Sequence, residues 1–300
     1  MGVNRRKFLK IAGMSTLGAA AVPASSALAV VNPIEWLDKK LGGFTPFETL
    51  LHLFHTPAGF KPGEALTGKQ WVMVVNVKQL DEEIAEACRE TCHRVHNVPK
   101  IDNPKHEIKW IWHSEYKHVF PGQHNEHIAE KYHHLPFLVM CNHCENPACV
   151  RVCPTKATFK RKQDGIVLMD MHRCIGCRFC MAACPFGARS FNWIIPWPRE
   201  SAGTLPRFRK GKEPPNPEFP TRVKGVVEKC NFCAERLAKG QIPACVEVCQ
   251  EAAKEKDKEP ALAFGDLADP DSEVRELLHS HFSIRRKPEL GTGPNVYYIV

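Results

Sequence analysis

The chain has 300 residues, 43% apolar and 25% charged, a composition that supports a folded core and excludes an intrinsically disordered protein. Its formal net charge is +8, but the first ten residues hold four of the 41 Lys and Arg and none of the 33 acidic residues. The rest carries 37 basic against 33 acidic side chains and gives no argument for nucleic-acid binding.

The N-terminus has the features of a twin-arginine export signal. Arg5 and Arg6 precede an apolar stretch of small residues that runs to Val22, and residues 27–29 (Ala-Leu-Ala) offer a cleavage site. We predict a signal over residues 1–29 and a place on the periplasmic or extracytoplasmic face of the membrane, peripheral or anchored by an uncleaved signal. This route exports folded chains, which suits a protein that receives its cofactor before export.

Beyond the signal, irregular stretches alternate with a few regular elements. Residues 30–70 read as an irregular arm, 99–135 as a polar insertion rich in His, and 193–222 as a Pro-rich insertion. Hydrophobic patterning predicts a strand over 71–75, a helix over 81–92, a hairpin of 158–161 and 166–169 around Asp164-Gly165, and strands over 262–264 and 296–300. No later segment reaches the roughly 18 consecutive apolar residues of a membrane span.

Fourteen cysteines are unusual for this length and require metal, disulfide or redox chemistry. Eight of them form two compact runs, each followed by Pro: Cys141-x2-Cys144-x4-Cys149-x3-Cys153 and Cys174-x2-Cys177-x2-Cys180-x3-Cys184. In bacterial ferredoxins the first three thiolates of such a run bind one 4Fe-4S cluster, and the fourth binds the neighbouring cluster. This exchange predicts cluster A on Cys141, Cys144, Cys149 and Cys184, and cluster B on Cys174, Cys177, Cys180 and Cys153.

Zinc sites and disulfides are the other common uses of clustered cysteines. C-x2-C pairs build tetrahedral zinc sites, and disulfides are frequent in exported proteins. Zinc ribbons separate two pairs by longer loops, whereas here each run is a complete quartet that ends before Pro. The pattern favours 4Fe-4S clusters over both alternatives.

Two further cysteine groups enclose the inner runs. The later group is Cys230-x2-Cys233-x11-Cys245-x3-Cys249. Only Cys88-x3-Cys92 remains of the earlier one, with Glu82 and Ala85 where its first two cysteines would fall. The exchange rule predicts cluster C on Cys230, Cys233, Cys245 and Cys92. A fourth cluster would need Ala85 as a ligand, which is chemically impossible, so we expect three 4Fe-4S clusters.

Two other interpretations apply to the cysteines at the broken site. Cys88-x3-Cys92-His93 resembles the C-x-x-C-H attachment sequence of haem c with one extra residue, and Cys88 and Cys249, left without a cluster, are candidates for a disulfide. Haem c is attached outside the cytoplasm, which is at odds with the export of a folded chain. The cluster interpretation of Cys92 is therefore favoured.

The four nested cysteine groups resemble those of the four-cluster ferredoxin-like subunits of dimethyl sulfoxide and polysulfide reductases. A closer resemblance is to the DsrO family, the exported iron-sulfur subunits of sulfite-reductase-associated DsrMKJOP complexes. The segments that carry it are Cys88-x3-Cys92-His-x2-His-Asn-Val-Pro, Cys141-Asn-His-Cys, Pro154-Thr-Lys-Ala-Thr-Phe-Lys, Val226-Val-Glu-Lys-Cys-Asn-Phe-Cys and Ile284-Arg-Arg-Lys-Pro-Glu-Leu-Gly.

The resemblance implies an α+β fold of tandem bacterial (2x4Fe-4S) ferredoxin-like modules. An inner module, 136–192, would be nested within an outer module, 71–98 and 223–267, and a C-terminal extension, 268–300, would follow. The chain departs from the four-cluster pattern at Glu82, Ala85 and Gln250, and these departures remove one cluster.

The same resemblance implies an electron-transfer subunit, with no catalytic residue or substrate site of its own. It would relay electrons in a quinone-linked membrane complex of sulfate or sulfite metabolism, between a quinone-reacting membrane subunit and a multihaem cytochrome c, beside other membrane and cytosolic subunits. The alternative is the iron-sulfur subunit of an exported molybdopterin oxidoreductase, of the dimethyl sulfoxide or polysulfide reductase or formate dehydrogenase type.

Overall fold

The structure is a computed structural model that describes residues 65–123, 127, 132, 135–194, 216–220 and 222–300. The predicted export signal, most of the predicted arm and most of the Pro-rich insertion lie outside these residues. All described residues belong to a single unit of the chain, Gly59–Val300. No helix among them is long and apolar enough to cross a membrane.

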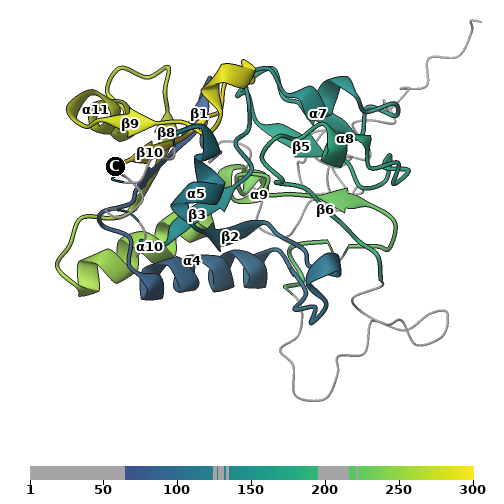
Figure 1. Cartoon of the computed structure of the whole chain (residues 1–300), viewed down its shortest axis with the longest axis horizontal. Helices are drawn as coiled ribbons and strands as arrows, with labels where there is room; N and C mark the ends of the chain where they lie inside the picture. The colour runs from purple at the N-terminus through teal and green to yellow at the C-terminus, as the bar shows by residue number, and fades with distance from the viewer. Residues whose placement is uncertain (1–64, 124–126, 128–131, 133–134, 195–215, 221) are drawn as a thin grey trace, which may run out of the picture. The chain divides into compact units, whose positions relative to one another are not determined.

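A four-stranded sheet contains both the first and the last strand of the described chain (Figure 1). β1 lies between β8 and β10, parallel to β10 and antiparallel to β8, and β9 pairs with the other edge of β10. The strands are β1 (Trp71–Asn76), β8 (Leu262–Asp266), β9 (Ser283–Ile284) and β10 (Val296–Ile299). The strands predicted over 71–75, 262–264 and 296–300 are thus confirmed.

The central strand β1 is apolar along nearly its whole length because both faces of the sheet are covered. Met73 and Val75 pack into the main core, together with residues of helices α4 (Glu82–Val95) and α10 (Ala244–Glu255). Val72 and Val74 form a second, smaller core with Val274 of helix α11 (Glu273–Ser280). A strand with one face in water would instead alternate apolar and polar residues.

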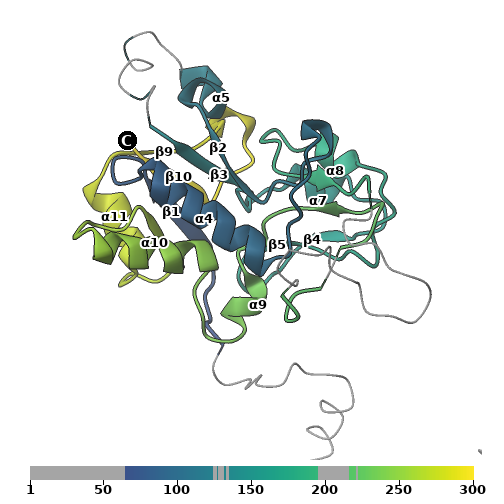
Figure 2. The same cartoon turned by 90° about the horizontal axis from the view of Figure 1, so that it is seen from below.

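Helix α4 (Glu82–Val95) confirms the predicted helix over 81–92 and extends it by three residues. The Asp81 carboxylate caps its start by accepting a hydrogen bond of 2.8 Å from the backbone N–H of Ile84. Apolar residues at helical spacing, including Cys88 and Cys92, form its buried face. That face packs along helix α10 (Ala244–Glu255), and the two helices lie side by side in Figures 1 and 2.

Two segments differ from their sequence-based description. Residues 268–300 carry β9 and β10, and β10 occupies the sheet position next to β1, so this segment completes the sheet rather than extending beyond it. The described part of 99–135 contributes Trp110 and Phe120 to the core and strand β2 (Ile111–Ser114), which pairs with β3 (Phe137–Met140). Its short helical turns are η2 (Pro104–His106), α5 (Tyr116–Val119) and η3 (Pro121–Gln123).

The remaining cysteine-rich part consists of short elements joined by loops, and it lies at the opposite end from the sheet in both views (Figures 1 and 2). The predicted hairpin is confirmed: β4 and β5 pair antiparallel, with Thr158 opposite Met169, around a left-handed Gly165. The elements are α7 (Ala148–Arg151), β4 (Thr158–Lys160), β5 (Val167–Met169), α8 (Phe179–Ala182), β6 (Ser190–Phe191), β7 (Val227–Glu228) and α9 (Ala234–Leu237). The turn η4 (Pro288–Leu290) lies between β9 and β10 in the C-terminal segment. With helices and strands mixed in this way, the predicted α+β class is confirmed.

Candidate metal centres

In three of the cysteine groups, the first C-x2-C loop has a left-handed backbone residue directly before its second cysteine. These residues are His143 (φ 41°), Gly176 (φ 71°) and Phe232 (φ 55°), which precede Cys144, Cys177 and Cys233. Such a conformation is unfavourable for a residue with a side chain, so the surrounding structure must hold it in place. Loops that combine right-handed and left-handed residues turn backbone N–H groups inward and form concave anion sites, a known setting for iron-sulfur clusters.

The first inner run meets Cys184, the last cysteine of the second run. Burial, with the neighbouring thiols of Cys141, Cys149 and Cys184, raises the pKa of Cys144 to about 12. Burial and the Cys141 thiol likewise raise the pKa of Cys184. Thiols this crowded resist ionisation in the absence of a cation, and bound iron removes that penalty by replacing the protons. The four residues predicted for cluster A are therefore neighbours, and their environment fits a metal cluster.

The second inner run meets Cys153, the last cysteine of the first run. The pKa of Cys180 is raised overall. Burial and the thiols of Cys149, Cys174 and Cys153 raise it, and this outweighs the lowering by Arg189. Burial alone would raise the pKa of Cys153, but hydrogen bonds outweigh it and lower that pKa. One of them comes from the backbone N–H of Thr158, 3.4 Å from the sulfur.

Cys177 is the exposed member of this group, and the other residues predicted for cluster B are more enclosed. The backbone N–H bond to Cys153 stabilises a thiolate before any metal is added. The residues predicted for cluster B thus include one solvent-facing ligand, Cys177, and one whose thiolate form is stabilised by hydrogen bonds, Cys153.

The α4–α10 contact brings Cys92 to the last cysteine group. Burial, followed by the neighbouring thiols of Cys230, Cys245 and Cys233, raises the pKa of Cys92 well above its ordinary value. Burial, with other contributions, raises the pKa values of Cys230 and Cys245 to about 12. The residues predicted for cluster C thus come together although Cys92 lies on a different helix, far earlier in the chain.

Cys88 and Cys249 form a separate, fully buried pair beside this group. A hydrogen bond between the two thiols raises the pKa of Cys88 and lowers that of Cys249, and the Cys88 sulfur lies 3.3 Å from the Cys245 carbonyl oxygen. All fourteen cysteines, these two included, are free thiols in the structure. The two residues are neighbours, as the predicted disulfide requires, and the disulfide itself stays a prediction.

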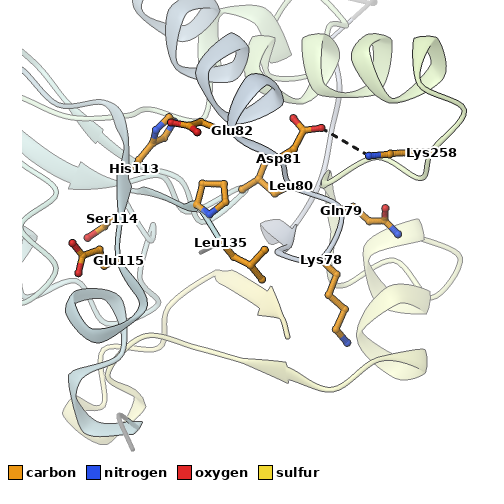
Figure 3. A pocket seen from close by; sticks show the side chains of 11 residues that line it. Lys78, Gln79, Leu80, Asp81, Glu82, His113, Ser114, Glu115, Leu135 and Lys258 are labelled. Carbon is orange, nitrogen blue, oxygen red and sulfur yellow. Dashed lines mark ion pairs between the residues drawn. The ribbon is translucent and has the colours of Figure 1, made fainter. Parts of the chain in front are cut away.

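Glu82 and Ala85, which replace the missing cysteines, do not join this thiol pair. Ala85 is buried in the core, whereas Glu82 is exposed and lines a surface pocket of about 600 Å³. Figure 3 shows the Glu82 side chain directed toward His113 in that pocket. Glu82 and Ala85 therefore supply no further metal ligand beside Cys88 and Cys249.

The cysteine groups are too open for a single tetrahedral ion. With zinc–sulfur bonds of about 2.3 Å, four thiolates around one zinc would lie about 3.8 Å apart. In the part of the chain that the structure describes, His96, Cys233 and Glu235 form the only set of three or more potential ligands whose atoms all lie within 4.8 Å of one another. The spacing within each cysteine group thus argues against zinc and leaves room for a cluster.

The haem interpretation of Cys88, Cys92 and His93 conflicts with the packing of α4. Both thiols lie on the helix face buried against α10, with exposed fractions of 0% and 4%. His93 instead lines a surface pocket with Arg89 and Glu90. Because the thiols and the imidazole point to different sides of the helix, a haem attached through both sulfurs would have to displace the core.

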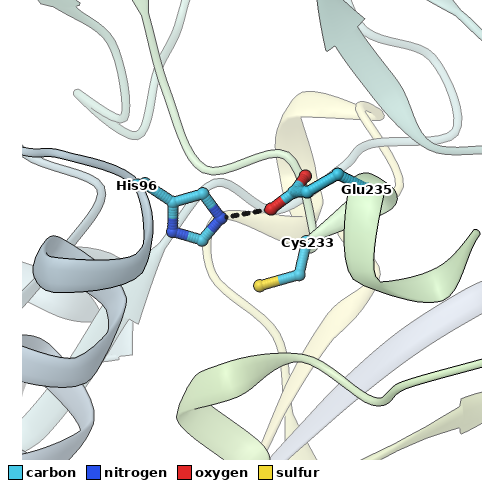
Figure 4. Close-up of side chains that lie close together, drawn as sticks. All are labelled: His96, Cys233 and Glu235. Carbon is cyan, nitrogen blue, oxygen red and sulfur yellow. Dashed lines mark hydrogen bonds and ion pairs between the residues drawn. The ribbon is translucent and has the colours of Figure 1, made fainter. Parts of the chain in front are cut away.

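The structure also reveals site residues that the spacing of cysteines did not indicate. The His96 imidazole Nε2 lies 2.7 Å from a Glu235 carboxylate oxygen, and its Nδ1 lies 2.8 Å from the Cys92 carbonyl oxygen and 3.7 Å from the Cys92 sulfur. Figure 4 shows this pair beside Cys233. Burial would raise the pKa of Glu235, but the hydrogen bond from His96 lowers it overall.

Two buried cationic residues near the ligand cysteines, Arg189 and Lys229, were also not identified from the sequence. Arg189 and Lys229 have exposed fractions of 5% and 3%, and the Lys229 ammonium donates a 2.7 Å hydrogen bond to the Cys230 carbonyl oxygen. Their positions near ligand cysteines, at 184 and 230, were the only available signal in the sequence. That signal is weak because basic residues beside such runs are mostly exposed.

Comparisons with known proteins agree with this chemistry. Residues 133–223 match the family model of a 4Fe-4S dicluster domain. Over 99% of its length the chain is 35% identical to the Hdr-like menaquinol oxidoreductase iron-sulfur subunit 1 of Archaeoglobus fulgidus, covering 97% of that protein. It is 33% identical to a subunit of the selenate reductase of Mesobacillus selenatarsenatis, over 99% of this chain and 97% of the relative.

A third relative is the menaquinone reductase iron-sulfur cluster-binding subunit of Nitratidesulfovibrio vulgaris. The chain is 34% identical to it, over 77% of this chain and 88% of the relative. The family model and the fourteen cysteines together show that the protein binds 4Fe-4S clusters.

The loop around Gly176 generates a prediction. Gly176 has φ 71°, and a Cβ there would clash with the carbonyl oxygen of Gly225. We expect Gly176→Ala to distort the Cys174–Cys177 loop and to lose one cluster, or about four irons per chain. Iron and protein assays on the purified variant measure the loss. Gly122→Ala is the matched control, because a Cβ at Gly122 meets open space. Full iron content in Gly176→Ala would contradict the expectation.

Proposed function

The chain belongs to the family of iron-sulfur electron-transfer subunits of membrane-associated, quinone-linked reductase complexes, and we propose that it serves a complex of sulfur metabolism of the DsrO type. In this proposal it relays electrons between a quinone-reacting membrane subunit and a multihaem cytochrome c. The supporting observation is its similarity, over nearly the whole length of both chains, to a menaquinol oxidoreductase iron-sulfur subunit. The sequence segments that resemble DsrO support the assignment to sulfur metabolism.

Three 4Fe-4S clusters would occupy the three cysteine groups and exchange electrons one at a time. The ligand sets are Cys141, Cys144, Cys149 and Cys184 for cluster A, Cys174, Cys177, Cys180 and Cys153 for cluster B, and Cys230, Cys233, Cys245 and Cys92 for cluster C. The neighbouring thiols that shift each pKa support these sets. The fold would then be two ferredoxin-like modules, the inner nested within the outer.

The same contacts support an order of clusters along a path. The Cys149 thiol raises the pKa of Cys180, so ligands of clusters A and B are neighbours. The Cys141 thiol raises the pKa of Cys230, so ligands of clusters A and C are also neighbours. Cluster A would therefore lie between the other two. Cluster B, with the exposed Cys177, would exchange electrons with one partner.

Cys92 gives the sharpest test of the ligand sets. Cys92→Ser removes one thiolate from cluster C, whereas the eight ligands of clusters A and B stay intact. We expect the variant to lose or convert one cluster, so that iron falls from about twelve atoms per chain toward eight. Iron analysis and electron paramagnetic resonance of the reduced protein measure this. Cys88→Ser, one helical turn away, should retain all three clusters. An unchanged iron content and spectrum in Cys92→Ser would show that Cys92 is not a ligand of cluster C.

The function is tested by isolating the chain with its partners from detergent-solubilised membranes. We expect c-type haem to co-purify with the chain, and addition of a reduced menaquinone analogue to reduce first the clusters and then the haem. Absorbance and electron paramagnetic resonance after rapid mixing follow both steps. Clusters that stay oxidised in the intact complex, with haem present, would contradict the proposed relay.

The second candidate is the iron-sulfur subunit of an exported molybdopterin oxidoreductase. It is favoured by the similarity to the selenate reductase subunit, which covers 99% of this chain. Elemental analysis of the same isolated complex separates the two proposals. Molybdenum and a pterin without c-type haem would support this alternative, and c-type haem without molybdenum would support the menaquinol-linked relay.

Export by the twin-arginine route is part of the proposal and has its own test. Changing both Arg5 and Arg6 to Lys keeps the charge but removes the guanidinium groups of the pair. We expect the unprocessed chain to accumulate in the cytoplasm, as measured by cell fractionation and immunoblotting. A variant with one of the two changes is the graded control. Export of the double variant at the normal level would show that residues 1–29 are not such a signal.

A further inference from the structure

Arg189 carries a positive charge into the interior of the cysteine-rich part. Its exposed fraction is 5%, and it directly precedes strand β6. One guanidinium nitrogen, Nη1, donates to the Thr158 hydroxyl oxygen at 3.2 Å and lies 3.9 Å from the Met169 sulfur. The other two nitrogens, Nε and Nη2, have no hydrogen-bond partner within the described residues. Among the described residues, these two nitrogens therefore have no oxygen acceptor within hydrogen-bond distance.

No carboxylate balances this charge in the part of the chain that the structure describes. The contrast is Arg222, whose side chain is equally buried but forms an ion pair of 2.7 Å with Glu228. A buried guanidinium without a counter-charge is strongly unfavourable, so some other negative group must stabilise Arg189. The fixed neutral partners, a hydroxyl and a thioether, do not supply one.

Cysteines assigned to two different ligand sets interact with Arg189. Burial alone would lower the pKa of Arg189, but Cys149, Cys180 and Cys141 outweigh it and raise that pKa. Cys141 and Cys149 are assigned to cluster A, and Cys180 is assigned to cluster B. Thr158, which accepts the hydrogen bond from Arg189 Nη1, also donates its backbone N–H to the sulfur of Cys153, a ligand assigned to cluster B. The guanidinium thus lies beside cysteines of both ligand sets.

We propose that Arg189 is a positioning charge that raises the reduction potentials of clusters A and B together. The proposal rests on the ligand sets assigned above. A cluster gains one negative charge when it accepts an electron, so a nearby fixed cation stabilises the reduced form more than the oxidised form. Because one charge stands beside both clusters, it shifts both reduction potentials in the same direction. The difference between the two potentials therefore changes little.

The main test removes the charge in the intact, cluster-loaded protein. Redox titration followed by electron paramagnetic resonance gives the midpoint potential of each cluster. In Arg189→Gln we expect the potentials of two clusters to fall and that of the third, cluster C, to stay in place. Arg189→Lys keeps the charge and should leave all three potentials close to those of the wild type.

Arg161 offers a matched control on the neighbouring hairpin. It is also an arginine, but its guanidinium is paired with the Asp164 carboxylate, with Nε 3.1 Å from the oxygen. Arg161→Gln should leave the potentials of all three clusters unchanged. A fall as large as that in Arg189→Gln would mean that any lost arginine has this effect, and would overturn the proposal.

A second pair of variants decides the matter if Arg189→Gln fails to hold its clusters. Met169→Glu places a carboxylate near the Arg189 Nη1 atom, and Met169→Gln has the same shape without the charge. We expect the first, but not the second, to lower the potentials of clusters A and B. Equal potentials in the two variants would overturn the proposal.

The outcomes also separate this inference from the proposed function. A wild-type protein with three titrating clusters, together with unmoved potentials in Arg189→Gln, refutes the role of Arg189 alone. A uniform fall of all three potentials in Arg189→Gln also refutes it, because a charge beside two clusters cannot shift the third equally. Fewer than three titrating clusters in the wild type would instead refute the ligand sets and the function that depends on them.

Discussion

The whole structure depends on one requirement: thiols from distant segments of the chain must meet at the same points inside the protein. Helix α4 supplies Cys92, and the loops before α10 supply its neighbours Cys230 and Cys233. Gathering thiolates in a region of low polarity is unfavourable without cations, as the raised pKa values of these cysteines show. Bound iron removes that cost, so cluster binding and folding stabilise each other in this part of the molecule.

Buried charges around the cysteine groups follow a consistent pattern. The two buried or half-buried acids near the ligands are each paired with a basic group, Glu228 with Arg222 and Glu235 with His96. The buried cations Arg189, Lys229 and Arg286, by contrast, form no carboxylate ion pair among the described residues. The acids near the ligands thus have basic or imidazole partners, whereas these cations have no carboxylate among the described residues, an arrangement that favours clusters with net negative charge.

The end of helix α4 and the cysteine-rich part are joined by hydrogen bonds as well as by apolar packing. Glu228 in β7 accepts hydrogen bonds from the Trp110 indole, at 2.7 Å, and from the Asn192 amide, at 2.6 Å, while Arg222 donates to the His96 carbonyl oxygen at the end of α4. All these groups are buried, so each one lost would leave another unsatisfied. This network holds the end of α4, and with it Cys92, in a fixed position relative to the inner cysteine runs.

The sequence alone determined whatever depends on short-range spacing. The two inner cysteine runs, helix α4 with its Asp81 cap, the β4–β5 hairpin and the apolar strand β1 all follow from residues within about a dozen positions of one another, because turn, helix and strand periods act over that distance. The chemistry of the cluster ligands was predictable for the same reason. Even the approach of Cys92 to the last cysteine group followed from an exchange rule that relates one spacing pattern to another.

Only the tertiary structure decided how distant segments pair and what surrounds the ligands. Nothing in the sequence of residues 268–300 indicates that β10 lies between β1 and β9, since strand partners are chosen by the packing of the complete core. The polar average of residues 99–135 concealed a buried Trp110, because composition describes a segment as a whole and not the side that faces inward. Arg189, Lys229 and His96 gain their roles from burial next to thiols contributed by other loops, and burial is a property of the folded chain alone.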